Sequence, residues 1–138
     1  MKTILCAGNR YCAEDRFGPM VYDVLYKNNL PKNIELIDAG LAGLDLLCHF
    51  EKSDRVIVID SVSGFSAPEE LVTIRFNELQ NNETIDYGHS GGLQYLLHCL
   101  PALEIIPKVE VILIGFEGIA DKETIAAAAS LALEYVNA

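Results

Sequence analysis

The sequence predicts a three-layer α/β domain, in which a mainly parallel five-stranded sheet has helices on both faces. Strand-like and helix-like segments alternate along the chain, as they do in doubly wound folds. Three of the strand-like segments, TILC, VIVI and VILI, are almost continuously apolar and β-branched, which is typical of strands covered on both faces. With 138 residues the chain is long enough for one sizeable core. We therefore expect a single domain.

Five apolar runs bounded by turn residues predict the strands. They cover residues 3–6, 34–38, 55–60, 71–76 and 110–115. Only a short loop separates the third strand from the fourth, and that loop is too short for a helical crossover. We therefore expect the fourth strand to run antiparallel at an edge of the sheet.

Apolar residues at helical spacing predict four helices. The first begins near Pro19, which suits the first turn of a helix, and the last has Asp121 as its N-cap. The four apolar stripes are Met20, Val21, Val24 and Leu25; Leu44, Leu47 and Cys48; Leu93, Leu96, Leu97 and Leu100; and Ile125, Ala128, Ala129, Ala132, Tyr135 and Val136.

Composition and charge limit the partners of the chain. Acidic residues outnumber basic residues by 20 to 10, giving a net charge of −10 at pH 7 with no lysine or arginine cluster. We therefore expect no nucleic-acid and no membrane partner. No apolar run reaches the roughly 18 residues of a membrane span, and the N-terminus lacks the features of a signal peptide. The sequence thus favours a cytoplasmic protein, and we expect a monomer.

The four cysteines do not form a CxxC motif. Cys6, Cys48 and Cys99 lie in strand-like or helical segments, so the simplest interpretation is that they are reduced thiols packed in the interior. Cys12 lies in a turn, where we interpret it as an ordinary loop residue.

Residues 6–19 join the first predicted strand to the first helix and contain an acidic pair, Glu14 and Asp15. Ligands of open α/β sheets bind at this edge. Asp60 ends the third predicted strand, and His89 precedes a predicted helix. Two carboxylates about 4 Å apart repel each other by about 4 kcal/mol at an effective dielectric of about 20, which a shared proton, a basic group or a metal cation would relieve. With His89 the set would suit a divalent transition metal.

Each of these residues also has a structural interpretation. Asp60 can cap the next helix, Asp15 or Glu14 can be a first-turn residue favoured by the helix dipole, and His89 can be an ordinary loop histidine. Asp38 is expected to bond to the turn that follows it. A dinucleotide site is rejected, because the segment CAGN lacks the three-glycine spacing and the acidic pair would repel a pyrophosphate.

Five motifs in order resemble the hydrogenase maturation endopeptidases. They are LCAGN followed by Glu14-Asp15 and Gly18-Pro19, then DAGLAGLDLL, RVIVID, HSGGL and LIGFEG. The resemblance covers nearly the whole chain and implies one hydrogenase maturation protease-like domain over residues 1–138.

The resemblance also implies an activity, the removal of a short C-terminal peptide from the nickel-loaded precursor of a [NiFe] hydrogenase large subunit. It implies that Asp15, Asp60 and His89 contact the nickel, which belongs to the substrate. Either this metal activates a water, or Asp15 or Asp60 acts as the general base. Substrate contacts are expected at Gly8, Asn9 and Gly40.

The chain departs from the family pattern at Cys6, at Arg16 and at Gly118. These departures support an alternative from another class, a non-catalytic assembly chaperone or binding module that recognises the nickel-site precursor. A hydrolase with an unrelated substrate is a third alternative, supported by the fold alone.

Overall fold

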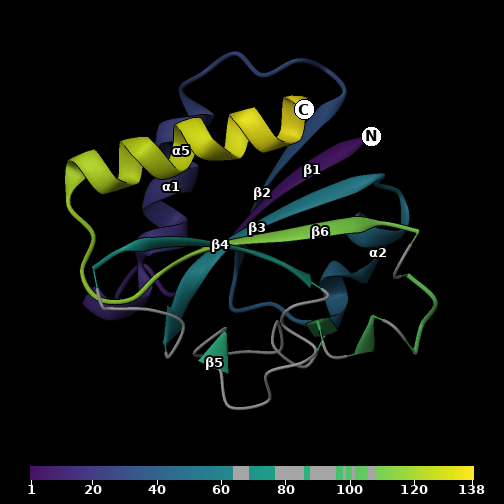
Figure 1. Cartoon of the computed structure of the whole chain (residues 1–138), viewed down its shortest axis with the longest axis horizontal. Helices are drawn as coiled ribbons and strands as arrows, with labels where there is room; N and C mark the ends of the chain where they lie inside the picture. Colours follow the sequence, from purple (N-terminus) through teal and green to yellow (C-terminus); the bar gives the residue numbers. More distant parts are fainter. Residues whose placement is uncertain (64–68, 77–85, 88–95, 98, 101, 106–107) are drawn as a thin grey trace.

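A computed structural model describes residues 1–63, 69–76, 86–87, 96–97, 99–100, 102–105 and 108–138 (Figure 1). The described strands are β1 (Lys2–Ala7), β2 (Ile34–Gly40), β3 (Arg55–Ser63), β4 (Leu71–Arg75), β5 (Asp86–Tyr87) and β6 (Glu110–Phe116). The described helices are α1 (Phe17–Tyr26), α2 (Leu47–Glu51) and α5 (Lys122–Asn137), with 3₁₀ turns η1 (Ala13–Asp15) and η2 (Leu44–Leu46).

The main sheet has the strand order β2-β1-β3-β6-β4. β1 is parallel to β2 and β3, and β3 is parallel to β6. β4 runs antiparallel to β6 at the end of this order. The prediction of a mainly parallel five-stranded sheet with an antiparallel edge strand is therefore confirmed.

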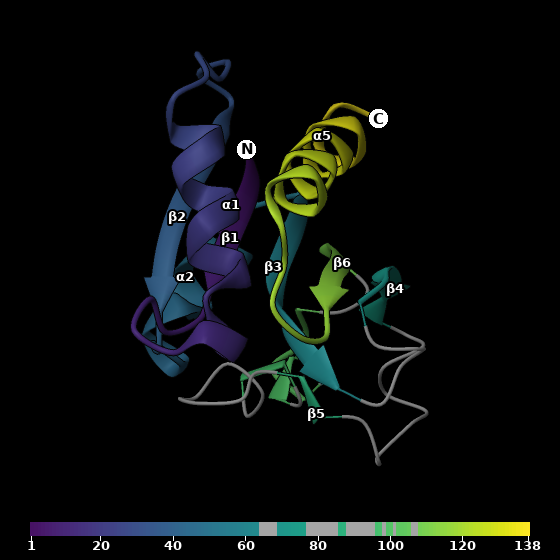
Figure 2. The same ribbon diagram turned by 90° about the vertical axis from the view of Figure 1, so that its left-hand side faces the viewer.

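Alternation along the central strands divides the core into two layers. Ile57 and Ile59 of β3 pack in one cluster with α1 and α5, whereas Val56 and Val58 pack in the other cluster with Phe50 of α2. In Figure 1, α1 and α5 lie above the sheet and α2 lies below it. The turned view in Figure 2 shows α1 and α5 side by side, in agreement with the contacts between them. Helices thus cover both faces, as the continuous apolar strands predict.

The first and last helices follow the sequence pattern closely. α1 begins at Phe17, so Pro19 lies in the first turn, where its missing N–H costs no helical hydrogen bond. α5 is capped by Asp121, whose Oδ1 accepts from the Thr124 N–H at 2.7 Å. Its buried residues are Ile125, Ala128, Ala129, Ala132 and Val136. Within the described ranges, no helix combines the length and the apolar character that crossing a bilayer requires.

The prediction for the second helix is right at Leu47, which packs partly buried against the core, and wrong at its other two positions. Leu44 is 55% exposed and Cys48 is also exposed, whereas Leu46 and Phe50 are buried. Leu46 and Phe50 are four residues apart in the segment formed by η2 and α2, so a different face of the same helical spacing meets the core. The prediction of a packed Cys48 thiol fails for the same reason.

The other predicted interior residues are partly confirmed. Leu96, Leu97 and Leu100 of the third stripe are buried in the cluster on the α2 side, while Leu93 lies outside the described residues. Cys6 is fully buried, and this burial raises the pKa of its thiol.

Two strands extend beyond the predicted carboxylate ends. β3 continues past Asp60 to Ser63, because Val62 and Ser63 pair with β5. β2 likewise continues past Asp38 to Gly40. Asp60 therefore lies inside a strand, and the interpretation that it caps a following helix is wrong.

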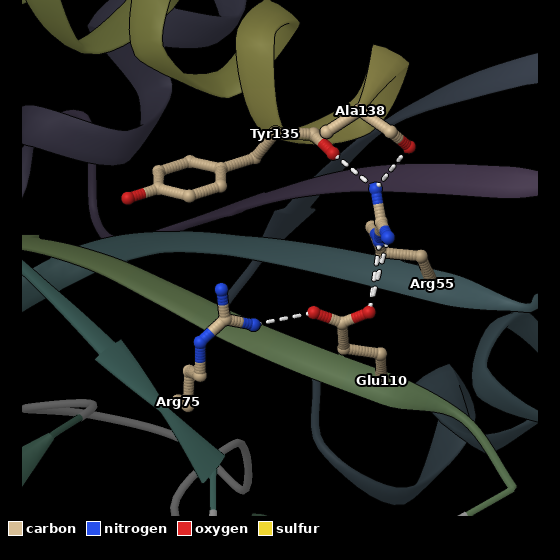
Figure 3. Close-up of polar contacts among 5 residues, drawn as sticks. All are labelled: Arg55, Arg75, Glu110, Tyr135 and Ala138. Atoms are coloured by element: carbon tan, nitrogen blue, oxygen red, sulfur yellow. Dashed lines mark hydrogen bonds and ion pairs between the residues drawn. The ribbon is translucent and has the colours of Figure 1, made fainter.

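The N-terminal ends of β3 and β6 are tied to the end of α5 by Arg55 (Figure 3). Its Nη1 donates to the main-chain oxygens of Tyr135 at 2.6 Å and Ala138 at 2.9 Å. Its Nε and Nη2 donate to Glu110, which also pairs with Arg75. This network lies at the end of the sheet away from the carboxyl ends of the parallel strands.

An Arg55→Met variant is expected to lower the free energy of unfolding by about 2 kcal/mol, since the main-chain oxygens of Tyr135 and Ala138 lose a donor and Glu110 is left with Arg75. Urea denaturation measures the change. Arg75→Gln is the matched control, because Arg75 is more exposed and its one ion pair among the described residues is with Glu110. A variant as stable as the wild type would contradict the role given to Arg55.

Candidate functional site

The turn at residues 8–12 follows β1 and is closed by a glycine. Gly8 has φ +139°, and a Cβ at this position would lie 2.2 Å from the main-chain oxygen of Asp15. Its N–H donates to the Gly40 oxygen at 2.9 Å, which ties the turn to the end of β2. Only glycine allows both the backbone conformation and the close approach, so this residue brings the chain back against Asp15.

Asp15 lies in η1 and is buried, with 5% of its surface exposed. Its Oδ2 accepts from the Asn9 N–H at 3.1 Å. The Asn9 side chain in turn accepts from the Tyr11 N–H at 2.9 Å, which is an Asx-turn. The turn therefore orients the Asp15 carboxylate through a main-chain donor.

Asp60 lies on β3 and is 2% exposed, and its Oδ1 accepts from the Ser61 N–H at 2.8 Å. β1 and β3 are neighbours, and η1 contacts β3. A Cβ on Gly18 would lie 2.0 Å from the Ala7 oxygen and 2.8 Å from the Ile59 oxygen, so the first turn of α1 rests on both strands. The structure thereby brings two of the predicted site residues, Asp15 and Asp60, to one edge of the sheet.

The third predicted ligand, His89, lies outside the described residues. The strand that precedes it in the chain, β5, pairs with β3 at Val62 and Ser63, just beyond Asp60. Among the described side chains, no three histidine, cysteine, aspartate or glutamate residues form a group that could hold a metal ion.

The three predicted substrate contacts, Gly8, Asn9 and Gly40, line one open pocket. Its volume is about 450 Å³, which lies within the range of ligand pockets. Tyr11, which is 96% exposed, and Leu41 add apolar surface to it. The pocket lies between the turn and the end of β2, and Asn9, which lines it, also donates its N–H to Asp15.

Arg10 also lines this pocket, and sequence analysis missed it. Its guanidinium donates to both carboxylate oxygens of Asp23, at 2.8 and 2.9 Å, and to Asp38 at 3.1 Å. Asp38 therefore pairs with Arg10, where the sequence led us to expect a bond to the following turn. The two acids lie 13 and 28 residues along the chain, so no local pattern indicates these contacts.

The hydrogen bonds from Arg10 hold the pKa of Asp23 below its ordinary value of 3.8. Since the folded-state pKa is lowered, the stability from this pair is present above about pH 3.8 and is lost as the pH falls through the lower value. In an Arg10→Gln variant we expect the Asp23 midpoint to rise toward 3.8. A carboxyl ¹³C NMR titration measures it, and an unchanged midpoint would contradict the pairing.

Comparison with known proteins gives a consistent picture. The family model described as "Hydrogenase maturation protease" matches residues 19–135. A putative hydrogenase maturation protease from Methanocaldococcus jannaschii is 33% identical over 118 residues, covering 83% of this chain and 74% of that protein.

Solved structures show the same fold. The hydrogenase maturating endopeptidase HybD from Escherichia coli superposes with a TM-score of 0.78 at 23% identity, over 99% of this chain and 91% of that one. A hydrogenase 2 maturation peptidase from Thaumarchaeota archaeon SCGC_AB-539-E09 has a TM-score of 0.62 at 27% identity, over 98% and 94% of the two chains.

Proposed function

Since this chain belongs to the family of hydrogenase maturation proteases, enzymes that hydrolyse peptide bonds, we propose that it removes a short C-terminal peptide from the nickel-loaded precursor of a [NiFe] hydrogenase large subunit. The observation that carries this proposal is the pair of buried carboxylates, Asp15 and Asp60, at the edge where such sheets bind their ligands.

The nickel in this account belongs to the substrate, and Asp15, Asp60 and His89 contact it there. Two carboxylates and an imidazole form an oxygen-and-nitrogen ligand set that suits a divalent transition metal. Support comes from the burial of both carboxylates and from β5, which pairs with β3 just beyond Asp60 and precedes His89 in the sequence. Nickel therefore acts as the feature by which a loaded precursor is recognised.

Hydrolysis requires a water oxygen to attack the scissile carbonyl carbon while the water gives up a proton. Asp15 or Asp60 accepts this proton as general base and passes it to the nitrogen that leaves when the C–N bond breaks. If the substrate's nickel instead polarises the water, the carboxylates serve to hold that metal in position. In both cases Asp15 and Asp60 are the groups on which the reaction depends.

The pocket formed by Gly8, Asn9 and Gly40 supplies the contacts to the substrate chain. Its place in the turn that holds Asp15 supports this assignment, because Asn9 both lines the pocket and donates its N–H to the Asp15 carboxylate. We assign the reaction to a monomer in the cytoplasm. All four cysteines are free, as expected in a reducing compartment.

The test is the intact mass of a nickel-loaded large-subunit precursor after incubation with the protein. We expect a discrete C-terminal loss with the wild type and an unchanged mass with Asp15→Asn, which keeps an oxygen for the Asn9 N–H but removes the charge. A precursor that co-purifies with the wild type without changing mass would overturn the protease assignment. That outcome would favour the assembly chaperone.

A further inference from the structure

We propose that Arg10 is a positioning residue for the proposed cleavage, because it holds the turn at residues 8–12 in the geometry that keeps the Asn9 N–H on the Asp15 carboxylate. The inference rests on the proposed function for its kinetic consequences. The contacts of Arg10 itself do not depend on that function.

The contacts of Arg10 join three elements. Its Nη1 and Nη2 each donate a hydrogen bond to the carboxylate of Asp23 in α1, at 2.8 and 2.9 Å. Nη2 also donates to Asp38 of β2 at 3.1 Å. Such forked, charge-assisted pairs fix geometry better than a single bond does. The turn is therefore fastened on one side to the helix and on the other to the edge of the sheet.

Arg10 directly follows Asn9, the residue whose N–H donates to Asp15 at 3.1 Å. The Asn9 carbonyl accepts from the Cys12 N–H, and the Cys12 carbonyl accepts from the Asp15 N–H. A movement of Arg10 therefore affects two hydrogen bonds of Asp15. One is made by the Asp15 carboxylate to the Asn9 N–H, and the other by the Asp15 N–H to the Cys12 carbonyl. Misplacing a catalytic group by about 1 Å costs up to about a hundredfold in rate.

The ion pair between Arg10 and Asp23 positions the turn but adds little to the free energy of unfolding. The Arg10 side chain is 39% exposed, and exposed ion pairs contribute little to the free energy of unfolding. Its loss should therefore leave the domain folded while it loosens the turn. This separation makes the proposal testable.

The experiment compares Arg10→Gln, Asp23→Asn and the double variant with the wild type. Hydrogen exchange of the Asn9 amide, followed by NMR, reports on the turn, and kcat and KM for cleavage of the nickel-loaded precursor report on the reaction. We expect each single variant to exchange about tenfold faster and to lose about tenfold in kcat, with KM little changed. The double variant should be no worse than Arg10→Gln alone, because Arg10→Gln already removes the pair with Asp23.

Two further variants complete the design. Arg10→Lys keeps the positive charge but cannot donate the two parallel hydrogen bonds of a guanidinium. Its kcat should therefore lie between those of Arg10→Gln and the wild type. Arg75→Gln breaks an ion pair at the other end of the sheet and should leave both readouts at wild-type values.

Unchanged Asn9 exchange in Arg10→Gln would overturn the proposal. So would a slow Arg10→Gln beside harmless Asp23→Asn and Asp38→Asn variants, since Arg10 would then act on the substrate directly. A wild-type protein that cleaves no loaded precursor, with faster exchange in the variants, would overturn the proposed function and the kinetic part of this inference. It would still support the claim that Arg10 fixes the position of the turn at residues 8–12.

Discussion

An Asp60→Asn variant is expected to lose about a thousandfold or more in the rate of precursor cleavage while remaining folded. Asparagine has the shape of aspartate and keeps an oxygen that can accept from the Ser61 N–H. It lacks the negative charge that contacting a cation or accepting a proton requires. We therefore expect the variant to remain folded but to lose the carboxylate charge that cleavage of the precursor requires.

The rate is measured by intact mass of the nickel-loaded precursor over time, with circular dichroism to show that the variant is folded. Glu14→Gln is the matched control, because Glu14 is an exposed carboxylate next to buried Asp15 in the same 3₁₀ turn. It removes one negative charge, as Asp60→Asn does, but from an exposed side chain. Full activity of Asp60→Asn, or equal losses in the two variants, would contradict the assignment of the site to the buried carboxylates.

Gly18→Ala is expected to have the largest effect on stability, lowering the free energy of unfolding by about 3 kcal/mol. The added Cβ would lie 2.0 Å from the Ala7 oxygen and 2.8 Å from the Ile59 oxygen. Both atoms belong to the backbone of central strands, so neither can move without disturbing the sheet. The first turn of α1 would have to lift, and Asp15 would move away from β3 with it.

Urea denaturation of Gly18→Ala beside Gly40→Ala separates this clash from an ordinary loss of glycine. A Cβ on Gly40 meets nothing within 4 Å, so that variant carries only the cost of its φ of +56°, about 1 kcal/mol. If Gly18→Ala were no less stable than Gly40→Ala, the close packing of α1 on the strand ends would be wrong.

The sheet could be predicted from the sequence because its three central strands, β1, β3 and β6, are buried on both faces. Continuous apolar, β-branched runs leave few other structures open to segments such as those that became β3 and β6. The short loop before β4 likewise was enough to predict its antiparallel direction. Neither inference needs information from distant parts of the chain.

The failures come from contacts between distant residues. The extension of β3 past Asp60 depends on pairing with β5, and the ion pairs of Arg10 depend on how α1 and β2 pack. In the segment of η2 and α2, the buried set Leu46, Leu47 and Phe50 has helical spacing just as the predicted set does, so spacing alone could not decide which face packs on the sheet.

The candidate site shows the same division. That Asp15 and Asp60 lie at one edge of the sheet follows from the rule for strand ends in parallel sheets, once β1 and β3 are known to be neighbours. The pocket lined by Gly8, Asn9 and Gly40 depends instead on the hydrogen bond between Gly8 and Gly40, which no sequence spacing indicates.

The most direct test of the account is to incubate the wild-type protein with the same large-subunit precursor in nickel-loaded and nickel-free form and to record both intact masses. The account predicts a discrete C-terminal loss in the nickel-loaded sample alone, because Asp15, Asp60 and His89 recognise the metal that the precursor carries. Equal cleavage of both forms would contradict nickel recognition at this site, and no cleavage of either would contradict the proposed protease activity.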